Sequence, residues 1–247
     1  MKVLNHGEIE LIDHMGSDLR ICEAARVSTG SKADKGPEKN KKLIEYLYMN
    51  NHVSPFEKVV LEFYVKCPIF VARQWFRHRT MSFNEKSARY SEFKWETYIP
   101  YDWRKQDNKN KQGSSEIVNP EFNSNWLNTL LEDSYQKSCD AYNELLLFGV
   151  AREQARTIMP VGQYTEFFMT VNLRNLFHFL ELRLHPHAQY EIRVYAEAIL
   201  KILKSLPNLE FSVNIFDKKR KFDYTISEKI KDFSLEKVQA YLEKMEE

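Results

Sequence analysis

Residues 59–90 read VVLEFYVKCPIFVARQWFRHRTMSFNEKSARY, and the strand and helix patterns in this stretch decide the expected fold class. Its first part, 59–65, is rich in β-branched and aromatic residues with partial alternation, which predicts a strand. We expect Cys67-Pro68 to end that strand, because Pro68 suits the first position of a helix over 69–77. The apolar face of this helix would carry Ile69, Phe70, Ala72 and Phe76.

Outward from this stretch, strand and helix patterns alternate along the chain. Alternating or β-rich runs predict strands over 1–12, at a sheet edge, and over 93–99 and 163–171. Asn172 is a natural N-cap for a helix over 173–184, whose core face would carry Leu173, Leu176, Phe177 and Leu180. We therefore expect an α+β fold, with a small, mainly antiparallel sheet flanked by long helices. The other predicted helices cover 18–26, 38–50, 119–147, a short segment with Arg152 and Arg156, 187–205 and a charged amphipathic 227–245.

The polar segment 104–118, which reads RKQDNKNKQGSSEIV, interrupts these patterns. Its polar composition and Gly113-Ser114-Ser115 predict a mobile loop, for which the role of a lid is one hypothesis.

The composition favours a packed cytoplasmic protein. Of 247 residues, 43% are apolar, and 36 Lys and Arg balance 35 Asp and Glu, so no overall field draws the chain to nucleic acid or membrane. Cys22, Cys67 and Cys139 cannot build a disulfide framework, and none stands in a CxxC pair, which favours a reducing compartment. The N-terminus lacks a signal-peptide pattern, and no apolar run reaches membrane-spanning length.

Positive charge is nevertheless concentrated in residues 77–90. Arg77, His78, Arg79 and Arg89 lie within thirteen positions. Guanidinium groups form paired hydrogen bonds with phosphate and carboxylate, so a site for a phosphorylated ligand is one interpretation. The neighbouring aromatic residues leave a nucleic-acid groove open as a second interpretation, although such a groove normally needs a wider basic face. A solvated surface loop is the third.

Other catalytic and binding motifs do not occur in the sequence. Neither a GxxxxGK[ST] loop nor a G-x-G-x-x-G after a strand is present, so side chains would have to hold a nucleotide. Cys67 is expected to be a buried small hydrophobe rather than a nucleophile, and Ser82 and Ser87 lack the nucleophile-elbow pattern. His185 and His187 form an HxH pair without a further ligand pattern, so we favour a surface or capping role over metal binding.

The Arg-His-Arg segment, seven further residues and Ser87 resemble the RHRx7S signature of the flavin-dependent thymidylate synthases. The resemblance covers about residues 1–216 and keeps the order of the family's motifs. It implies a catalytic domain over 1–216 and leaves 217–247 as a charged helical tail. The other resembling motifs lie at 54–57, 72–76, 84–85, 89–90, 172–176 and 187–192.

This resemblance implies an enzyme that methylates dUMP to dTMP, with methylenetetrahydrofolate as carbon donor and NADPH as reductant. A tightly bound FAD would transfer the hydride, without an enzyme nucleophile and without a metal. The family also implies a homotetramer with active sites shared between subunits, and neither a nucleic-acid nor a membrane partner. A flavoprotein that acts on another pyrimidine and a nucleic-acid-binding module remain the alternatives.

The resemblance also implies roles for individual residues. Arg183 would be catalytic, because a fixed guanidinium favours the uracil ionised at N3. Arg156 would hold the nucleotide from a neighbouring subunit. The residues expected to bind flavin are Ser54, Arg77, His78, Arg79, Glu85, Asn172, Leu173, Arg174 and His178. The residues expected to bind dUMP are His52, Gln74, Arg77, Glu85, Ser87, Ala88, Arg89, Arg156 and Arg183.

Overall fold

A computed structural model describes residues 1–31, 34–89, 94–108, 111, 113–118 and 124–243. The chain divides into two units, the first formed by residues 1–15 and 59–202 and the second by 16–58 and 203–247. No helix in this described part of the chain has both the length and the apolar character that crossing a membrane requires.

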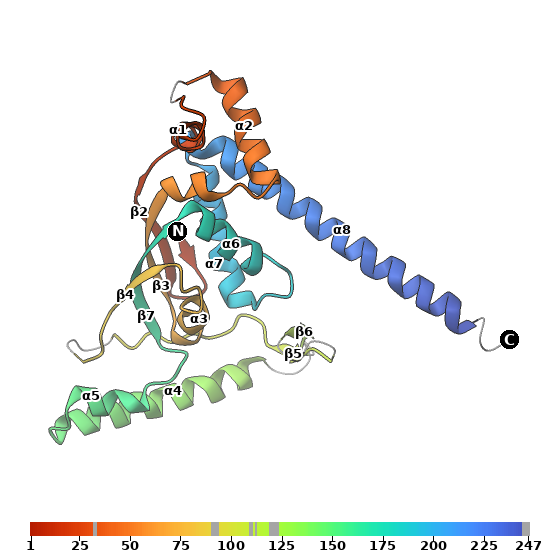
Figure 1. Cartoon of the computed structure of the whole chain (residues 1–247). Helices are drawn as coiled ribbons and strands as arrows, with labels where there is room; N and C mark the ends of the chain where they lie inside the picture. The colour runs from red at the N-terminus through yellow and green to blue at the C-terminus, as the bar shows by residue number, and fades with distance from the viewer. Residues whose placement is uncertain (32–33, 90–93, 109–110, 112, 119–123, 244–247) are drawn as a thin grey trace. The chain divides into compact units, whose positions relative to one another are not determined.

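The first unit is built on a five-stranded sheet (Figure 1). Every adjacent pair is antiparallel, which confirms the predicted kind of sheet. Side chains alternate between the two faces of a strand, and Leu61, Phe63 and Val65 accordingly point into the core with no exposed surface. The strands, in their order across the sheet, are β1 (Lys2–Val3), β2 (Gly7–Met15), β3 (Val60–Pro68), β7 (Tyr164–Asn172) and β4 (Ser82–Glu85).

Three helices meet the sheet at Trp75, the last residue of α3 (Ile69–Trp75). The Trp75 ring stacks on Phe179 of α6 (Leu173–Arg183), with 5.0 Å between ring centroids. Its edge contacts join Tyr195 of α7 (Tyr190–Lys204) at 5.7 Å and Phe167 of β7 at 5.5 Å. Such aromatic pairs add stability beyond the area they bury. The cluster therefore fixes the end of α3, and with it the start of the basic stretch.

The transition from β7 to α6 follows the sequence prediction. The side chain of Asn172 accepts a hydrogen bond from the Asn175 backbone N–H at 3.0 Å, which caps α6 directly at the end of the strand. Arg174 and His178 are exposed one turn apart on the outer side of α6. The predicted core face is confirmed, because Leu173, Leu176, Phe177 and Leu180 are all buried.

The structure corrects the prediction for 104–118, whose described residues contain a hairpin rather than an irregular loop. Strand β5 (Arg104–Gln106) pairs with β6 (Ser114–Ile117). All four residues of β6 are exposed, so no apolar alternation marked it as a strand. The predicted helix over 119–147 is confirmed as α4 (Ser124–Leu147), while 119–123 lie outside the described residues. The short helix is α5 (Arg152–Ala155), followed by η2 (Arg156–Ile158).

One strand prediction was wrong, and one further strand was missed. Of the predicted strand 93–99, residue 93 lies outside the described residues, and within 94–99 Thr97 makes only an isolated bridge to Gln163. Conversely, no strand was expected at β4 inside the basic stretch. Polar residues dominate β4, and Phe83 is its one apolar side chain.

The predicted end of the first strand at Cys67-Pro68 is confirmed, whereas the end and the face of the next helix differ from the prediction. Strand β3 continues through Pro68, which pairs with Tyr164 at the end of the ladder. Helix α3 then ends at Trp75 instead of residue 77. Its buried residues are Val71, Ala72 and Trp75, so only Ala72 of the predicted face is buried.

The second unit is helical. Buried Asp18 caps its longest helix by accepting hydrogen bonds from the backbone N–H groups of Phe211 at 2.6 Å and Ser212 at 3.1 Å. The predicted tail helix 227–245 is the C-terminal part of that helix, and residues 244–245 lie outside the described chain. The elements of this unit are α1 (Asp18–Val27), α2 (Pro37–Met49), η1 (Ser54–Lys58), η3 (Pro207–Leu209) and α8 (Glu210–Glu243).

Candidate active site

The Arg-His-Arg turn, residues 77–79, follows α3 and lies against α6. The rings of His78 and Phe179 have centroids 4.9 Å apart, and the His78 and His178 centroids are 6.5 Å apart. The side chains of Arg77 and Arg79 are exposed, whereas His78 is half-buried. The structure therefore brings residues predicted from two distant motifs to one place.

Arg183, the predicted catalytic residue, contacts His78 directly. Its Nε–H donates a hydrogen bond to His78 Nε2 at 3.1 Å. Burial lowers the pKa of His78 to about 4, and the charges of Arg183 and His178 contribute to this lowering. The imidazole is therefore neutral at pH 7 and, because Nε2 accepts, carries its proton on Nδ1. Burial also lowers the pKa of Arg183, although a guanidinium remains charged in proteins.

Exposed guanidinium groups gather around this turn. Arg77 and Arg79 extend from the turn, and Arg174 lies one helical turn before His178 on the neighbouring α6. Guanidinium groups donate paired hydrogen bonds to phosphate oxygens, and His78 Nδ1–H adds a neutral donor. The flavin-binding role of these residues remains a prediction.

Two of the predicted flavin-binding residues have structural roles. The Asn172 side chain caps α6. Leu173 is fully buried, and its backbone N–H donates to the carbonyl oxygen of Val59 at 2.9 Å. The Leu173 side chain is thus a core side chain, and its residue contributes by positioning α6.

Three of the residues predicted to bind dUMP line a cavity of about 500 Å³. Glu85, Ala88 and Arg156 line it, and all three belong to the same chain. Glu85 is held by Thr165, whose hydroxyl donates to the carboxylate at 2.7 Å. Arg156, which was predicted to act from a neighbouring subunit, therefore accompanies Glu85 and Ala88 of its own subunit. The other lining residues are Ile69, Ala72, Arg73, Phe76, Lys86, Glu153, Thr157, Met159, Val161 and Thr165.

Glu153 contacts two of the predicted arginines, which sequence reasoning did not anticipate. Its carboxylate lies 3.7 Å from an Nη atom of Arg89, and its carbonyl oxygen accepts from Arg156 Nε at 3.4 Å. The Arg89 backbone N–H donates to Ser87 Oγ at 3.2 Å. Two of the predicted phosphate-binding residues thus contact Glu153, Arg89 at its carboxylate and Arg156 at its backbone carbonyl.

Gln74, another predicted nucleotide-binding residue, belongs to a different set of contacts. Its side-chain amide nitrogen donates to the amide oxygen of Gln189. The Gln189 nitrogen in turn donates to the carboxylate of Glu191 at 2.9 Å. Sequence reasoning matched the motif 187–192 but gave Gln189 and Glu191 no role.

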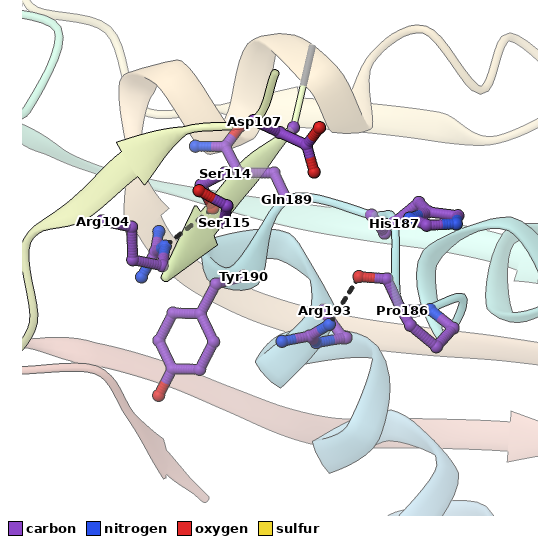
Figure 2. A pocket seen from close by; sticks show the side chains of 11 residues that line it. Arg104, Asp107, Ser114, Ser115, Pro186, His187, Gln189, Tyr190 and Arg193 are labelled. Atoms are coloured by element: carbon purple, nitrogen blue, oxygen red, sulfur yellow. Dashed lines mark hydrogen bonds between the residues drawn. The ribbon is translucent and has the colours of Figure 1, made fainter. Parts of the chain in front are cut away.

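Gln189 also lines a second cavity, of about 460 Å³, between the β5–β6 hairpin and the start of α7 (Figure 2). Arg104 donates from Nε to Ser114 Oγ at 2.9 Å, and its guanidinium carbon lies 5.0 Å from the centroid of the Tyr190 ring. On the opposite side, Arg193 donates to the Pro186 carbonyl oxygen at 2.8 Å. The remaining lining residues are Asp107, Gly113, Ser115, His187 and Ala188.

The other two predicted ligand-binding residues, Ser54 and His52, belong to the second unit. Ser54 is exposed at the start of η1. The His52 backbone N–H donates to the Leu47 carbonyl oxygen at 2.8 Å, and its ring centroid lies 5.9 Å from that of Tyr46. Their roles toward ligands remain predictions.

Cys67 and the pair formed by His185 and His187 are structural groups. Cys67 is fully buried, as predicted, and burial raises the pKa of its thiol well above the usual range, so it is a poor nucleophile. His185 and His187 have ring centroids 5.0 Å apart, and the His187 backbone N–H donates to His185 Nδ1. Among residues whose positions are described, no group of three or more His, Cys, Asp and Glu could hold a metal.

Comparison with known proteins places these features in a family. The family model described as thymidylate synthase complementing protein matches residues 10–207. The flavin-dependent thymidylate synthase of Thermosipho africanus is 49% identical over 203 residues, which cover 82% of this chain and 88% of the relative. The Thermus thermophilus enzyme of the same name is 51% identical over 202 residues, covering 82% and 73%.

A solved structure gives the same result for the fold. The UMP/dUMP methylase PolB from Streptomyces cacaoi, bound with 5-Br UMP, superposes with a TM-score of 0.77 and is 33% identical. The alignment covers 86% of this chain and 94% of that protein. The present chain belongs to the flavin-dependent thymidylate synthase family.

Proposed function

We propose that this protein is an enzyme that converts dUMP to dTMP by flavin-dependent reductive methylation. The contact between Arg183 and neutral His78 carries the proposal, because it holds a charged guanidinium beside the Arg-His-Arg turn. This turn lies within the segment matched by the family model.

Arg77, Arg79 and Arg174 would hold the pyrophosphate of FAD, and His78 Nδ1–H would donate to the same cofactor. When bound, FAD supplies the hydride for the reaction, with NADPH as reductant and methylenetetrahydrofolate as carbon donor. The remaining protein contribution is to bind, orient and polarise the pyrimidine.

Arg183 stabilises negative charge on the uracil ring. Its Nε donates to His78, which leaves the two terminal nitrogens for the pyrimidine carbonyl and ionised N3. Because His78 is neutral, it does not repel Arg183 and does not compete for the uracil's developing charge. This role is electrostatic: a preorganised donor stabilises charge without transferring a proton.

The cavity between α3, β4 and η2 would take the nucleotide phosphate. Arg89 and Arg156 would bind the phosphate, together with Ser87 and the backbone of Ala88. The ion pair between Arg89 and Glu153 is long and exposed, so exchanging the carboxylate for phosphate costs little.

The proposal includes a homotetramer with shared sites, folate as co-substrate and a cytoplasmic location. It also includes a catalytic domain over residues 1–216 and a charged helical tail over 217–247. Ser54 and His52 would complete the flavin and nucleotide sites, respectively.

A second candidate substrate is UMP. The PolB structure, which is described as a UMP/dUMP methylase, favours this alternative. The two candidates share the uracil and phosphate contacts and differ at the sugar 2′ position.

The decisive experiment uses the purified, flavin-loaded protein. We expect a yellow protein that oxidises NADPH and forms dTMP only when dUMP and methylenetetrahydrofolate are both present. Replacing dUMP with UMP tests the second candidate in the same assay. A colourless protein that binds oligonucleotides tightly and salt-dependently would contradict the enzyme assignment.

A further inference from the structure

Glu191 is a buried carboxylate at the centre of a hydrogen-bond network. The residue is 3% exposed and receives three donors, from Arg104 Nη2 at 2.6 Å, the Tyr98 hydroxyl at 2.9 Å and Gln189 Nε2 at 2.9 Å. Burial alone would raise the pKa of Glu191, but the hydrogen bond and the charge of Arg104 lower it by more. The pKa therefore lies below its usual value, and the carboxylate stays ionised. An ionised carboxylate can only accept hydrogen bonds.

This property determines the orientation of both neighbouring amides. Gln189 must turn its nitrogen toward Glu191, since a carboxylate accepts only from a donor. The Gln189 oxygen then faces Gln74, so the Gln74 side chain must donate a hydrogen bond to it from its amide nitrogen. The chain of donors therefore fixes which atom of each carboxamide is the nitrogen and which is the oxygen. Atomic positions alone rarely distinguish the two.

We propose that Gln189 and Glu191 are positioning residues that set the orientation of the Gln74 carboxamide for nucleotide binding. The proposal rests on the assignment of Gln74 to the dUMP site. One Gln74 N–H is used by Gln189, which leaves its other N–H and its amide oxygen, in fixed directions, for the nucleotide. A side chain held in its binding orientation loses less conformational entropy when the ligand arrives.

Arg104 gives this network its charge balance. It comes from β5, whereas Glu191 lies in the first turn of α7 and Gln189 directly precedes that helix. Figure 2 shows the labelled Arg104 and Gln189 on the wall of the same cavity. The ion pair thereby joins the hairpin to the residues that orient Gln74. A carboxylate without this arginine would favour protonation in its buried position, and a protonated carboxyl group could present a donor to Gln189.

The test is a double-mutant cycle on the flavin-loaded protein, with dUMP binding measured by calorimetry. The variants are Gln74→Ala, Gln189→Met and the double variant. Gln136→Met is the matched control, because the side chain of Gln136 also donates to a carboxylate, that of Asp140 at 2.7 Å, but on the exposed surface of α4. Flavin content and melting temperature are recorded for every variant.

We expect Gln189→Met to raise the Kd for dUMP about tenfold, the size of one well-made hydrogen bond, while flavin content and the KM for NADPH stay unchanged. Gln136→Met should leave the Kd unchanged. The double variant should bind dUMP as Gln74→Ala does, because Gln189 acts only through Gln74. A structural effect of Gln189 would instead add to that of Gln74.

Any other result of the dUMP-binding measurements overturns the inference. An additive double variant, or an unchanged Kd in Gln189→Met, removes the positioning role and leaves the proposed function intact if Gln74→Ala weakens binding. An unchanged Kd in Gln74→Ala removes both the inference and the nucleotide role of Gln74. If the wild-type protein still forms dTMP, the proposed function stands in spite of this result. If Gln189→Met loses flavin, Gln189→Asn replaces it in the cycle, because its shorter amide also breaks both contacts.

Discussion

Replacing Arg183 with alanine should abolish most dTMP formation while flavin remains bound. The substitution removes the guanidinium that donates to His78 and the two terminal nitrogens available to uracil. His78, Arg77 and Arg79, which belong to the Arg-His-Arg turn, keep their backbone positions, since the Trp75 cluster fixes the end of α3. The loss should therefore fall on turnover rather than on cofactor binding.

The expected size follows from the kind of interaction that is lost. Removing one preorganised donor to a developing negative charge lowers kcat by roughly 10² to 10³, or about 3–4 kcal/mol of barrier. Arg183→Lys restores the charge but neither the planar fork nor the Nε contact at 3.1 Å, so we expect only partial recovery. The matched control is Arg193→Lys, at another half-buried arginine, which contacts the Pro186 carbonyl, the Glu197 carboxylate and the Tyr190 ring.

The same substitution should change the titration of His78. The pKa of His78 is lowered to about 4, mainly by burial and next by the charges of Arg183 and His178. Arg183→Ala should therefore raise this pKa part of the way to the usual value near 6.5. At pH 7 the ring is neutral in both folded and unfolded chains. As pH falls from about 6.5 to about 4, only the unfolded chain takes up the proton, so the wild-type protein loses stability in this window.

Three measurements check this reasoning. Single-turnover assays give dTMP formation, absorbance gives flavin content, and urea unfolding at pH 7 and pH 5 gives stability. Arg183→Ala should lose less stability than wild type between the two pH values. Unchanged turnover would refute the role of Arg183, and an unchanged pH dependence would refute its electrostatic effect on His78.

Three further variants or reagents test other parts of the structure. Arg89→Ala should weaken dUMP binding, measured by calorimetry, much more than FAD binding; equal losses would show that the phosphate contacts are assigned wrongly. Glu191→Ala should lower the free energy of unfolding, measured by urea titration, by about 3–5 kcal/mol, because it leaves buried donors without an acceptor. The control Glu197→Ala, on the exposed side of α7, should change it by less than about 0.5 kcal/mol. Iodoacetamide should modify the half-buried Cys139 before Cys67, whose thiol is buried and has a raised pKa; peptide mass spectrometry showing the reverse order would contradict that burial.

The parts of the fold that follow from local patterns were predictable. Strands β3 and β7 carry alternating buried residues, and Asn172 marks the start of α6 unambiguously. Strands β4 and β6 were not predictable in the same way. Their side chains are mostly exposed and polar, so the strand state depends on the partner that each one meets rather than on its own sequence.

The residues missed at the site share a different cause. Glu191 receives Arg104 and Tyr98 from 87 and 93 residues away, and nothing local signals that its charge is buried. Glu153 lies on a four-residue helix, where its neighbours in sequence reveal little about Arg89. Pairings over such separations depend on tertiary packing, so sequence reasoning found the motifs but not the acidic residues that organise them.

The position of β4 also bears on how one basic stretch would serve two ligands under the proposed function. In sequence, Arg77–Arg79 and Ser87–Arg89 look like a single cluster of charge. Between them, Ser82–Glu85 is extended and paired with β7, which separates its ends by about 10 Å. The cavity that Glu85 and Ala88 line includes neither Arg77 nor His78 among its described lining residues. Two subunits would therefore contact a nucleotide that touches both groups more easily than one chain alone. One subunit would present the Arg-His-Arg turn, and the other would present the phosphate site.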